Sequence, residues 1–412
     1  MVWAACHNGI RTEFSYPRGD GMERIVILGG GFAGLTLATE LDPLAESGRA
    51  EITLVERKTT FQVGFSMQWV LAGRRSRDAG ERPYTAMRAR HVHFVHDEVV
   101  ALDTSGRVVQ TKAARLPYDH LLVALGAELA PELVPGLPEA SYNLCDMASV
   151  EQLKAAVERV ERGTVAVLVA AVPFKCPPAP YEYAFLIEDV LRRRGVQEHV
   201  RVVVATPEPQ PMPVAGKAVG DAIRAMLGER GIEFLPGRKV TAVDVSKRVA
   251  AFEDGSELAY DVLAAMPPHR APKVLRDAGL TDASGFVPAK LGTFETAIRD
   301  VYALGDVAAL KLPNGNPHPK AGVFAEAQAL TLARAIASRL GHGAPAEYGG
   351  SGTCFVDVGQ EKAAAAEASL LDSAGPKVIL QPPSKAGLDD KARFERERIH
   401  RWFTGSALTG PG

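Results

Sequence analysis

Residues 24–34 read Arg-Ile-Val-Ile-Leu-Gly-Gly-Gly-Phe-Ala-Gly, a short apolar run that leads into a glycine-rich turn. Such a run is typical of a buried strand in a parallel sheet, and residues 35–41 predict a helix directly after the turn. A second apolar run, at 52–55, ends at the acidic residue Glu56. Strand, glycines, helix, strand and acid therefore follow one another in the order of a dinucleotide-binding βαβ unit.

Each glycine of the turn has a physical reason to be there. Gly29 permits the tight turn, Gly31 lets the backbone approach a pyrophosphate, and Gly34 lets the helix pack closely against the strand. The N-terminus of the helix then faces the anionic phosphates. A glycine-rich turn without a ligand is the alternative, which the complete βαβ context disfavours. The residues that we expect at the dinucleotide are Gly29, Gly31, Phe32, Ala33, Gly34 and Glu56.

The composition excludes several classes of protein. The chain has 412 residues, of which 46% are hydrophobic, enough for two or three domains with ordinary cores. Lys and Arg number 47 and Asp and Glu 49, so the net charge of −2 disfavours binding to nucleic acid. Four cysteines without metal-ligand spacing argue against a disulfide scaffold and a metal site. No apolar run approaches the ~20 residues that span a bilayer.

The first 22 residues have a different character from the rest of the chain. Residues 1–22 carry neither apolar periodicity nor the basic start and apolar stretch of an export signal. We expect them to form a flexible extension in which Cys6 is incidental, and we expect the protein to be cytoplasmic.

The chain contains an internal repeat. Ile-Val-Ile-Leu at 25–28 is echoed by Val-Ala-Val-Leu at 165–168, and Leu-Pro-Tyr-Asp-His-Leu-Leu-Val-Ala at 116–124 is echoed by Leu-Ala-Tyr-Asp-Val-Leu-Ala-Ala at 258–265. A pair of strand-like runs precedes each copy of the second segment. We therefore predict an α/β fold with two tandem Rossmann-like domains of the glutathione-reductase type and a short C-terminal region. In flavoproteins of this layout the first copy holds FAD and the second usually holds NAD(P)H.

The second copy lacks the glycines that a dinucleotide needs. After Leu168 it reads Val-Ala-Ala-Val-Pro-Phe-Lys-Cys-Pro-Pro at 169–178. Side chains at Ala171 and Phe174 would occupy the space in which the backbone must approach phosphate. We infer that this copy keeps the fold without binding a nicotinamide dinucleotide and presents Cys176 in place of the glycines. A degenerate loop without a role is the alternative.

A second cofactor signature lies at 296–306, where an apolar strand ends at Gly305 and Asp306. In flavoproteins of this layout such an aspartate contacts the ribityl or pyrophosphate part of FAD, whereas an ordinary turn residue is the alternative. The FAD domain is therefore expected to be discontinuous. The expected domains are an extension at 1–22, a first FAD-binding part at 23–145, a second Rossmann-like domain at 146–268, a return segment at 269–345 and a C-terminal region at 346–412.

Three further stretches are more specific. They read Lys-Cys-Pro-Pro-Ala-Pro-Tyr-Glu at 175–182, Pro-Lys-Ala-Gly-Val-Phe-Ala-Glu at 319–326 and Thr-Cys-Phe-Val-Asp at 353–357. Together with Arg-Trp-Phe at 401–403 they resemble sulfide:quinone oxidoreductases and the flavoprotein subunit of flavocytochrome c sulfide dehydrogenase. The resemblance implies an FAD-dependent enzyme that oxidises sulfide to zero-valent sulfur or polysulfide and reduces a membrane quinone.

The resemblance also implies a redox-active cysteine pair, Cys176 and Cys354, beside the flavin. Hydrosulfide would attack their disulfide, or a polysulfide bridge between them, and free a thiolate that adds to the flavin. The family pattern favours Cys354 for the flavin side, and the dipole of the helix after Cys176 would favour its thiolate form. Cys145 stands where sulfide:quinone oxidoreductases have a third cysteine. A role in sulfur transfer and a buried inert thiol are equally open for it.

The same family divides in how it holds FAD. The flavocytochrome subunit attaches FAD through a cysteine in the segment that corresponds to 60–66 here. This segment reads Thr-Phe-Gln-Val-Gly-Phe-Ser and has no cysteine, so FAD is expected to be bound non-covalently. The resemblance adds Val99, Ala124, Gly126, Lys320 and Gly322 to Gly305 and Asp306 as cofactor-binding residues.

Two charged residues complete the expected site. Glu182 falls in the first turn of the helix after Cys176, where it could move protons at the sulfide site or merely favour the helix start. The resemblance puts Lys320 near the flavin ring, where its charge would stabilise the anionic reduced flavin. A solvated lysine is the alternative.

The C-terminal tail mixes aromatic and basic side chains, with Phe394, Ile399, Trp402 and Phe403 among arginines. It is expected either to lie in a membrane interface or to dock as a helix on the protein core. The expected partners are sulfide or a related sulfur donor, a membrane quinone, the inner face of a membrane as a peripheral attachment, and a second copy in a homo-oligomer.

Three other functions remain open: electron transfer to a cytochrome c, a type II NADH dehydrogenase and a non-enzymatic flavin redox sensor. The absent attachment cysteine and export signal disfavour the first, and the lost glycines disfavour the second. The third would need neither paired cysteines nor access to a quinone.

Overall fold

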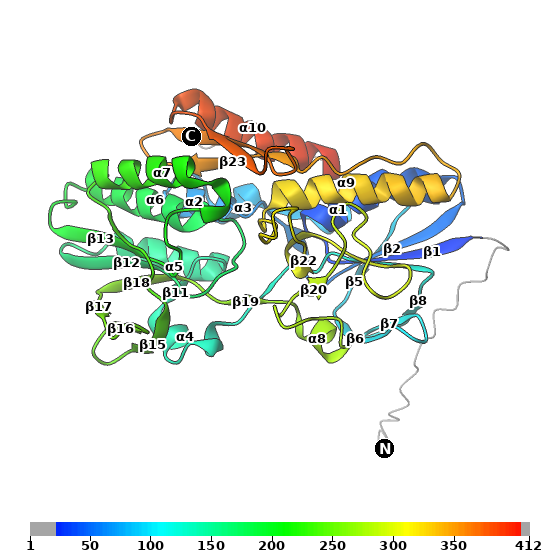
Figure 1. The fold of residues 1–412 in the computed structure, drawn as a ribbon, viewed down its shortest axis with the longest axis horizontal. Coiled ribbons are helices and arrows are strands. Elements are labelled where there is room, and N and C mark those ends of the chain that lie inside the picture. Colours follow the sequence, from blue (N-terminus) through cyan, green and yellow to red (C-terminus); the bar gives the residue numbers. More distant parts are fainter. Residues whose placement is uncertain (1–21, 405–412) are drawn as a thin grey trace, which may run out of the picture.

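A computed structural model describes residues 22–404, and its two main sheets lie side by side (Figure 1). The first sheet consists of β1 (Glu23–Leu28), β2 (Ala50–Glu56), β5 (His93–His96), β9 (His120–Val123) and β21 (Val301–Ala303). The strands pair in parallel in the order β21-β9-β1-β2-β5, so two stretches far apart in the chain build this sheet. The expectations for residues 1–21, including Cys6, lie outside the described residues.

The second sheet is also parallel. It consists of β11 (Tyr142–Asn143), β12 (Gly163–Val169), β13 (Val200–Ala205), β14 (Glu233–Leu235) and β18 (Val262–Met266). The strand order is β11-β18-β12-β13-β14. The predicted fold class, α/β with two tandem Rossmann-like units, is therefore confirmed.

Each unit carries a small antiparallel sheet besides its main one. The strands are β6 (Val99–Asp103), β7 (Val108–Thr111) and β8 (Arg115–Pro117) in the first unit, and β15 (Val240–Asp244), β16 (Val249–Phe252) and β17 (Glu257–Ala259) in the second. The sequence predicted a strand pair at each place, and the structure adds a third strand. Both sheets have a register shift near their start, between Val99 and Ala101 and between Val240 and Ala242. The internal repeat of the chain thus includes the same local irregularity in the hydrogen-bond ladder of each small sheet.

Helices cover the sheets, and a C-terminal layer joins the two units (Figure 1). In the first unit α1 (Phe32–Glu46) and α9 (Gly322–Arg339) pack against each other, and the second unit carries α5 (Met147–Val157), α6 (Ala179–Arg193) and α7 (Lys217–Glu229). The C-terminal layer consists of the antiparallel strands β23 (Ser351–Asp357), β24 (Ala363–Ser369) and β25 (Lys377–Leu380) followed by α10 (Lys385–Trp402). Because β23 contacts both α6 and α9, this layer bridges the units.

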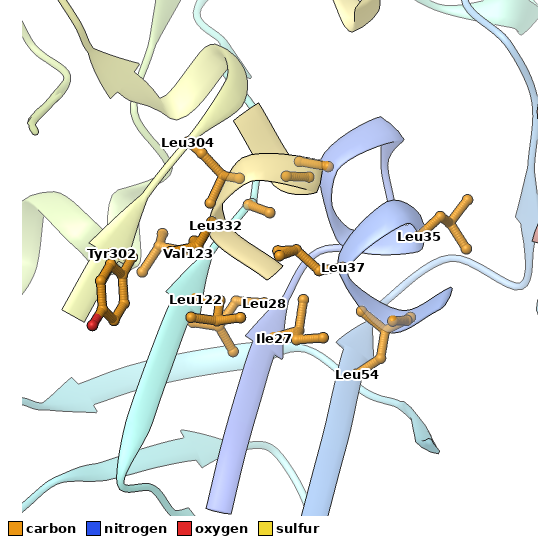
Figure 2. Packing of buried hydrophobic residues seen from close by; sticks show 14 of the residues in the cluster. Ile27, Leu28, Leu35, Leu37, Leu54, Leu122, Val123, Tyr302, Leu304 and Leu332 are labelled. Atoms are coloured by element: carbon orange, nitrogen blue, oxygen red, sulfur yellow. The ribbon is translucent and has the colours of Figure 1, made fainter. Parts of the chain in front are cut away.

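The core of the first unit fixes the glycine-rich turn in place. Ile27 and Leu28 of β1 are fully buried among Leu54 of β2, Leu122 of β9 and Leu37 of α1 (Figure 2). Burying a side chain of this size contributes roughly 1.5–3 kcal/mol. The end of β1, and with it the start of the turn, is therefore held from three sides.

The shorter elements connect these parts. None of the helices in the described residues is long and apolar enough to cross a membrane. The remaining helices and strands are β3 (Thr60–Phe61), α2 (Ser66–Leu71), α3 (Arg77–Gly80), β4 (Arg82–Pro83), β10 (Glu128–Leu129), α4 (Leu137–Ala140), β19 (His269–Arg270), α8 (Lys273–Asp277), β20 (Val287–Pro288) and β22 (Ala308–Ala309), with short 3₁₀ turns at Tyr84–Ala86, Pro131–Leu133, Pro213–Ala215 and Gly305–Val307.

Candidate functional site

The three glycines of the turn between β1 and α1 are required for different reasons. Gly29 has a φ of +97°, and a Cβ there would lie 2.5 Å from the carbonyl oxygen of Ala124. A Cβ on Gly34 would lie 1.8 Å from the carbonyl oxygen of Gly29. A Cβ on Gly31 would meet no atom within 4 Å. Packing therefore requires the outer two glycines, whereas Gly31 borders open space at the N-terminus of α1, where an anionic group can bind.

Glu56, at the end of β2, is bonded to this turn. Its Oε2 accepts a hydrogen bond from the N–H of Gly30 at 2.7 Å, and its Oε1 accepts one from the N–H of Lys58 at 2.9 Å. Each carboxylate oxygen has a second lone pair, so the expected bond to a ribose hydroxyl can form without breaking either contact. Tyr84, which the sequence did not single out, donates from its hydroxyl to the carbonyl oxygen of Gly30 at 2.7 Å. The turn is thus held from both sides.

Two other expected cofactor residues border the same end of the first sheet. Gly126 follows β9 with a φ of +67°, and a Cβ on it would meet no atom within 4 Å. Val99 begins β6 two residues after Asp97, whose N–H donates to the carbonyl oxygen of Glu56 at 3.1 Å. Both residues therefore lie along the edge on which Glu56 and the glycine turn meet.

The return segment brings a second helix N-terminus to the turn. Gly322 begins α9, and a Cβ on it would lie 3.0 Å from the ring of Phe32, the first residue of α1. A Cβ on Gly305 would lie 3.3 Å from Ala325 and 3.9 Å from Ala33. The N-termini of α1 and α9 therefore converge with the Gly305 turn, and both helix dipoles favour an anionic ligand there.

Asp306 lies at this convergence with an unsatisfied carboxylate. Its Oδ1 is buried without a hydrogen-bond partner among the described residues, and burial raises the pKa of the carboxyl. An unpaired buried acceptor costs about 1–3 kcal/mol, which a hydroxyl of a bound cofactor would offset. The open space at Gly31 and the free acceptor of Asp306 together fit FAD, which carries both a pyrophosphate and a row of hydroxyls.

Lys320 is buried, so the alternative of a solvated lysine is wrong. Its Nζ donates to the carbonyl oxygens of Asp306 at 2.7 Å and Ala308 at 3.0 Å, and it lies 3.7 Å from the ring centroid of Phe286. Burial lowers the pKa of Lys320 to about 8, although the charge of Asp306 opposes the shift. The lysine thus places a buried cation beside Asp306, and its contact with a flavin stays a prediction.

Cys176 and Cys354 come from different parts of the fold. Cys176 has a left-handed φ of +58°, and its N–H donates to the carbonyl oxygen of Lys320 at 2.7 Å. This conformation costs a non-glycine residue roughly 1–2 kcal/mol, which the bond to Lys320 helps to offset. Cys354 lies within β23, opposite Ala366 of β24. Both are half-buried free thiols, as is Cys145.

The thiols of Cys176 and Cys354 share one electrostatic environment. Burial raises the pKa of Cys176 well above its usual value, and the charges of Glu182 and Cys354 raise it further. Burial raises the pKa of Cys354 to about 12, and Glu182 adds to the shift. Burial and these charges oppose the effect that we expected of the helix dipole, and the net shift in the pKa of Cys176 disfavours its thiolate. The helix itself begins three residues after Cys176, at Ala179.

Cys145 lies at the edge of the same group. Its Sγ lies 3.2 Å from the Sδ of Met266, and its N–H donates to Oδ1 of Asn143 at 2.8 Å. A charge on Cys145 adds to the rise in the pKa of Cys176, as a charge on Cys354 does, so both of these cysteines lie within electrostatic range of Cys176. Burial raises the pKa of Cys145, and the charge of Lys175 opposes this shift. A role for Cys145 in sulfur transfer stays a prediction.

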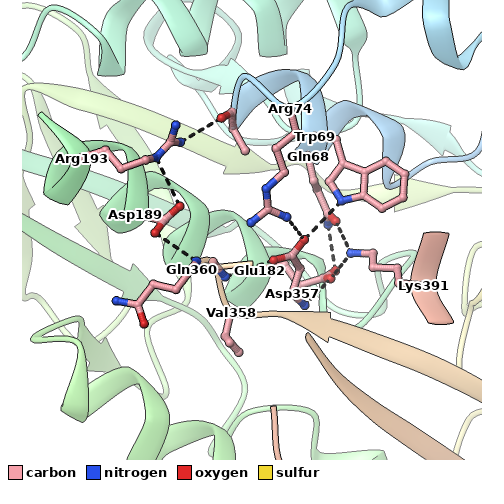
Figure 3. A network of polar contacts seen from close by, with 12 residues as sticks. Gln68, Trp69, Arg74, Glu182, Asp189, Arg193, Asp357, Val358, Gln360 and Lys391 are labelled. Atoms are coloured by element: carbon pink, nitrogen blue, oxygen red, sulfur yellow. Dashed lines mark hydrogen bonds and ion pairs between the residues drawn. The ribbon is translucent and has the colours of Figure 1, made fainter. Parts of the chain in front are cut away.

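Glu182 is buried in a polar network rather than free beside the thiols (Figure 3). Its Oε1 accepts from Nζ of Lys391 at 2.5 Å and from the N–H of Asp357 at 2.8 Å, and its Oε2 accepts from Nε2 of Gln68 at 2.8 Å. The network connects α6 with α2, β23 and α10. Glu182 thus acts on the cysteines as a fixed charge, and the proton transfer that its position suggested would have to break these bonds.

Two more ion pairs reinforce the network, and the sequence interpretation missed them. Arg74 donates to Oδ2 of Asp357 at 2.7 Å, and Arg75 makes a bidentate contact with Glu395 at 2.8 and 3.0 Å. A signal for Lys391 and Glu395 exists in the sequence, because they lie at helical spacing within the stripe of α10 that carries its buried apolar residues. A charge on such a stripe indicates a buried partner.

The apolar residues of α10 and of the residue that follows it dock on the protein core, which was the second of the two expectations for the tail. Trp402 is fully buried, with its ring centroid 5.2 Å from that of Phe32 and 5.5 Å from that of Phe61. Ile399 and Phe403 are buried as well. The expectation that these three side chains lie in a membrane interface is therefore wrong, because the FAD-binding unit already covers them.

A cleft of about 540 Å³ opens between α9, β23 and α10. Phe355, the residue after Cys354, lines it together with Phe394 of α10, and their ring centroids lie 5.9 Å apart. Phe394 also stacks on Phe32, with the centroids 6.2 Å apart. The cleft therefore leads towards the converging helix N-termini and runs along the strand of Cys354.

The second unit has no phosphate-binding turn after β12. Phe174 is buried in this loop, and α6 begins only after two prolines. Glu208, which follows β13 much as Glu56 ends β2, accepts a hydrogen bond from the hydroxyl of Tyr181 at 2.6 Å. Burial raises the pKa of Glu208 to about 7. The acid that could meet a ribose hydroxyl in this unit is thus bonded to a tyrosine of the chain itself.

Comparisons with known proteins agree with this architecture. A family model described as pyridine nucleotide-disulphide oxidoreductase matches residues 23–329. The mitochondrial sulfide:quinone oxidoreductase of Dictyostelium discoideum is 27% identical over 364 residues, which cover 84% of this chain and 77% of that protein. A type II NADH:quinone oxidoreductase of Staphylococcus saprophyticus is 22% identical, over 72% of this chain and 77% of that protein. The X-ray structure of the sulfide:quinone oxidoreductase from Aquifex aeolicus has the same fold, with a TM-score of 0.80 and 21% identity over 91% of this chain and 90% of that one.

Proposed function

This chain belongs to the pyridine nucleotide-disulphide oxidoreductase family, whose members are FAD-binding oxidoreductases, and from this premise we propose that it oxidises sulfide and passes the electrons to a quinone. The activity printed for its relatives supports the proposal, since sulfide:quinone oxidoreductases match most of the chain. The observation that carries it is the cysteine pair: Cys176 and Cys354 come from segments far apart in the chain and lie in the field of the same carboxylate, Glu182.

FAD, when bound, supplies a two-electron acceptor that sulfur can reduce and a quinone can reoxidise. The residues that would hold it each have a separate task. Gly31 would let the backbone approach the pyrophosphate, in a turn whose packing requires Gly29 and Gly34. Glu56 would accept from a ribose hydroxyl, Asp306 would accept from a further hydroxyl, and Lys320 would provide a nearby positive charge.

The cysteine pair would carry the sulfur chemistry in its disulfide form. A hydrosulfide attacks one sulfur of the Cys176–Cys354 disulfide, a new S–S bond forms, and the other cysteine leaves as a thiolate with the electron pair of the broken bond. The product is a persulfide that holds the zero-valent sulfur. Because burial raises the pKa of both thiols, a free thiolate is costly here, which favours rapid transfer of its electrons.

We propose the cleft between α9, β23 and α10 as the quinone site. Phe355 and Phe394 offer aromatic faces to a flat apolar ring, and Phe394 reaches Phe32 at the start of α1. A quinone resides in a bilayer, so this face would have to meet a membrane surface. The three arginines that line the cleft are each paired with a carboxylate, Arg393 with Asp390 and both Arg398 and Arg401 with Glu326. Peripheral attachment to the inner face of the membrane is therefore proposed from the quinone substrate alone.

Oxidation of NADH is the second candidate, because type II NADH:quinone oxidoreductases also match the chain. The second unit speaks against it. The loop after β12 lacks the glycines for a pyrophosphate, Phe174 fills it, and Glu208 is bonded to Tyr181. Without a second phosphate site, a nicotinamide nucleotide has little to hold it.

Anaerobic titration of the purified holoprotein separates the two candidates. We expect sulfide to bleach the flavin absorbance, NADH to leave it unchanged, and a soluble quinone analogue to restore it. Cys354→Ser should slow the bleaching by sulfide at least about a hundredfold, because the disulfide can no longer form. Its FAD content, measured by absorbance, controls for folding. Bleaching by NADH alone, or a Cys354→Ser protein that reacts with sulfide at the normal rate, would overturn the proposal.

A further inference from the structure

His269 on β19 has a buried ring nitrogen without a partner. Its side chain is only 8% exposed, its Nδ1 lies 2.7 Å from the carbonyl oxygen of Pro267, and its Nε2 has no hydrogen-bond partner among residues 22–404. A carbonyl oxygen can only accept, so Nδ1 carries the hydrogen and Nε2 carries a lone pair. Burial, together with the charges of Lys175 and Lys320, lowers the pKa of His269 to about 3. The ring is therefore neutral and presents a fixed acceptor inside the protein.

Lys175, the residue before Cys176, supplies a positive charge at the same place. It is half-buried and forms no hydrogen bond or ion pair with any other described residue. The N–H of Ala170, at the start of the loop that carries Lys175, donates to the carbonyl oxygen of Met266 at 2.9 Å, which places this loop beside the segment that leads to His269. The charge of Lys175 lowers the pKa of His269 and opposes the rise in the pKa of Cys145 and of Asp306. Lys175 forms no ion pair with Asp306 or with another described carboxylate, so its charge is available to an anionic ligand.

The other charged groups nearby are already engaged. Lys320 donates to two carbonyl oxygens, and Asp146 accepts from the N–H of Ser149 as the N-cap of α5. Asp306 has a free Oδ1 at the helix N-termini, where the cofactor hydroxyl is expected. The ammonium group of Lys175 and the lone pair of His269 are what remains for a further ligand.

We propose that Lys175 and His269 bind the sulfur substrate as the hydrosulfide anion, beside Cys145 and Cys176. This inference deepens the proposed function and rests on it. A hydrosulfide has one negative charge and one S–H group, so the ammonium group of Lys175 pairs with the charge while Nε2 of His269 accepts the S–H hydrogen. Neutral dihydrogen sulfide has no charge to pair with Lys175. An anion without a hydrogen would be repelled by the lone pair of Nε2. The two side chains thus select the one form of sulfide that is both a nucleophile and a donor.

The position of Lys175 connects the binding of hydrosulfide with its attack on the disulfide. It directly precedes Cys176, whose N–H donates to the carbonyl oxygen of Lys320, so an anion paired with Lys175 is held on the same short loop as the sulfur that it attacks. An unpaired sulfur anion would be costly to bury among these residues. The ion pair and the hydrogen bond offset that cost before the S–S bond breaks.

Substitutions at the two positions test the inference through the sulfide concentration that half-bleaches the flavin. Lys175→Gln should raise this concentration about tenfold, because a charge-assisted contact is lost, and lower the maximal bleaching rate much less. His269→Leu should raise it about fivefold, and His269→Gln, which can restore an acceptor, should recover most of the loss. Lys377→Gln, which removes an exposed lysine on β25, is the matched control and should behave as the unsubstituted protein. The FAD content of each variant is measured in parallel.

The outcomes distinguish failure of the hydrosulfide site from failure of the proposed function. A half-bleaching concentration that Lys175→Gln leaves unchanged overturns the inference while the proposed function stands. A His269→Leu protein that loses FAD but keeps the normal half-bleaching concentration also overturns it, since Nε2 would then contact the cofactor. If sulfide does not bleach the unsubstituted holoprotein, the proposed function fails and the inference fails with it.

Discussion

The ammonium group of Lys391 on α10 lies 2.5 Å from a carboxylate oxygen of Glu182 on α6, and each side chain is only 1% exposed. This pair joins the C-terminal layer to the second unit at the level of the thiols. Since Glu182 also accepts from the N–H of Asp357 on β23, the pair helps to set where the strand of Cys354 lies relative to Cys176. A buried charge is costly without its partner, so neither residue can be replaced alone without consequence.

We expect Lys391→Met to lower the free energy of unfolding of the holoprotein by about 3–5 kcal/mol, because it leaves Glu182 charged and unpaired in the interior. Denaturant titration followed by tryptophan fluorescence measures the change. Lys385→Met is the control on the same helix, since its ion pair with Glu361 is exposed and contributes at most about 1 kcal/mol. Adding Glu182→Gln to Lys391→Met should recover part of the loss. A double variant no more stable than Lys391→Met would contradict this account of the pair.

Alanine substitutions in the glycine-rich turn should separate ligand binding from packing. Gly31→Ala places its Cβ in open space at an ordinary φ of −80°, so the cofactor-free protein should unfold at nearly the normal temperature. The same methyl group would occupy the approach to the pyrophosphate, so we expect FAD affinity to fall at least about tenfold. Fluorescence titration with FAD and thermal unfolding of the apoprotein measure the two effects.

Gly34→Ala is the matched packing variant, because its Cβ would overlap the backbone of Gly29 at 1.8 Å. We expect it to lose stability with or without FAD. A Gly31→Ala protein that binds FAD normally would show that the cofactor does not approach this turn.

The sequence predicted much of the fold because the signals that decide it are local or repeated. The turn after 24–28 and the echo at 165–168 are visible as short patterns, and each predicts a strand that the structure contains. The Gly305–Asp306 signature predicted that the chain returns to the first unit, and β21 indeed pairs with β9. Such features can be recognised from the periodicity and composition of a short segment alone.

The site was less predictable, because its properties arise between distant segments. The pKa of Cys176 depends on Glu182 and Cys354, and only the folded chain brings Cys354 close. The partner of Glu182, Lys391, lies 209 positions further along the chain. Similarly, α10 is basic and aromatic in sequence, and only the structure shows that Trp402 packs on Phe32. Desolvation has no local signature in a sequence.

Buried neutral histidines should make the stability depend on pH. His318 accepts from the hydroxyl of Tyr348 at 2.8 Å and donates to the carbonyl oxygen of Pro319 at 3.0 Å. Burial lowers its pKa from the ordinary 6.5 to about 4, so between these values the unfolded state binds more protons than the folded state. The stability that His318 contributes is therefore complete above pH 6.5 and is lost as the pH falls towards 4.

We expect the free energy of unfolding to fall between pH 7.5 and pH 5, with His318 accounting for about 2 kcal/mol of the decrease. His318→Gln should make this decrease smaller by that amount, whatever its own effect on stability at pH 7.5. His342→Gln, at an exposed position, is the control and should leave the pH dependence unchanged. Equal slopes in His318→Gln and the unsubstituted protein would mean that His318 is not buried in its neutral form.

The aromatic lining of the cleft predicts that the two halves of the reaction can be separated. Phe394→Ala removes a ring that contacts Phe355 and Phe32, so the loss of aromatic contact with a quinone should cost about 1–2 kcal/mol of its binding, or roughly tenfold in the half-saturating concentration. The bleaching of the flavin by sulfide occurs before the quinone binds and should keep its normal rate, which makes it the internal control. Stopped-flow measurement of each half-reaction gives both numbers. If Phe394→Ala slows the sulfide step and leaves the quinone dependence unchanged, the ring belongs to the sulfur side, and the electrons must leave the protein by a route other than this cleft.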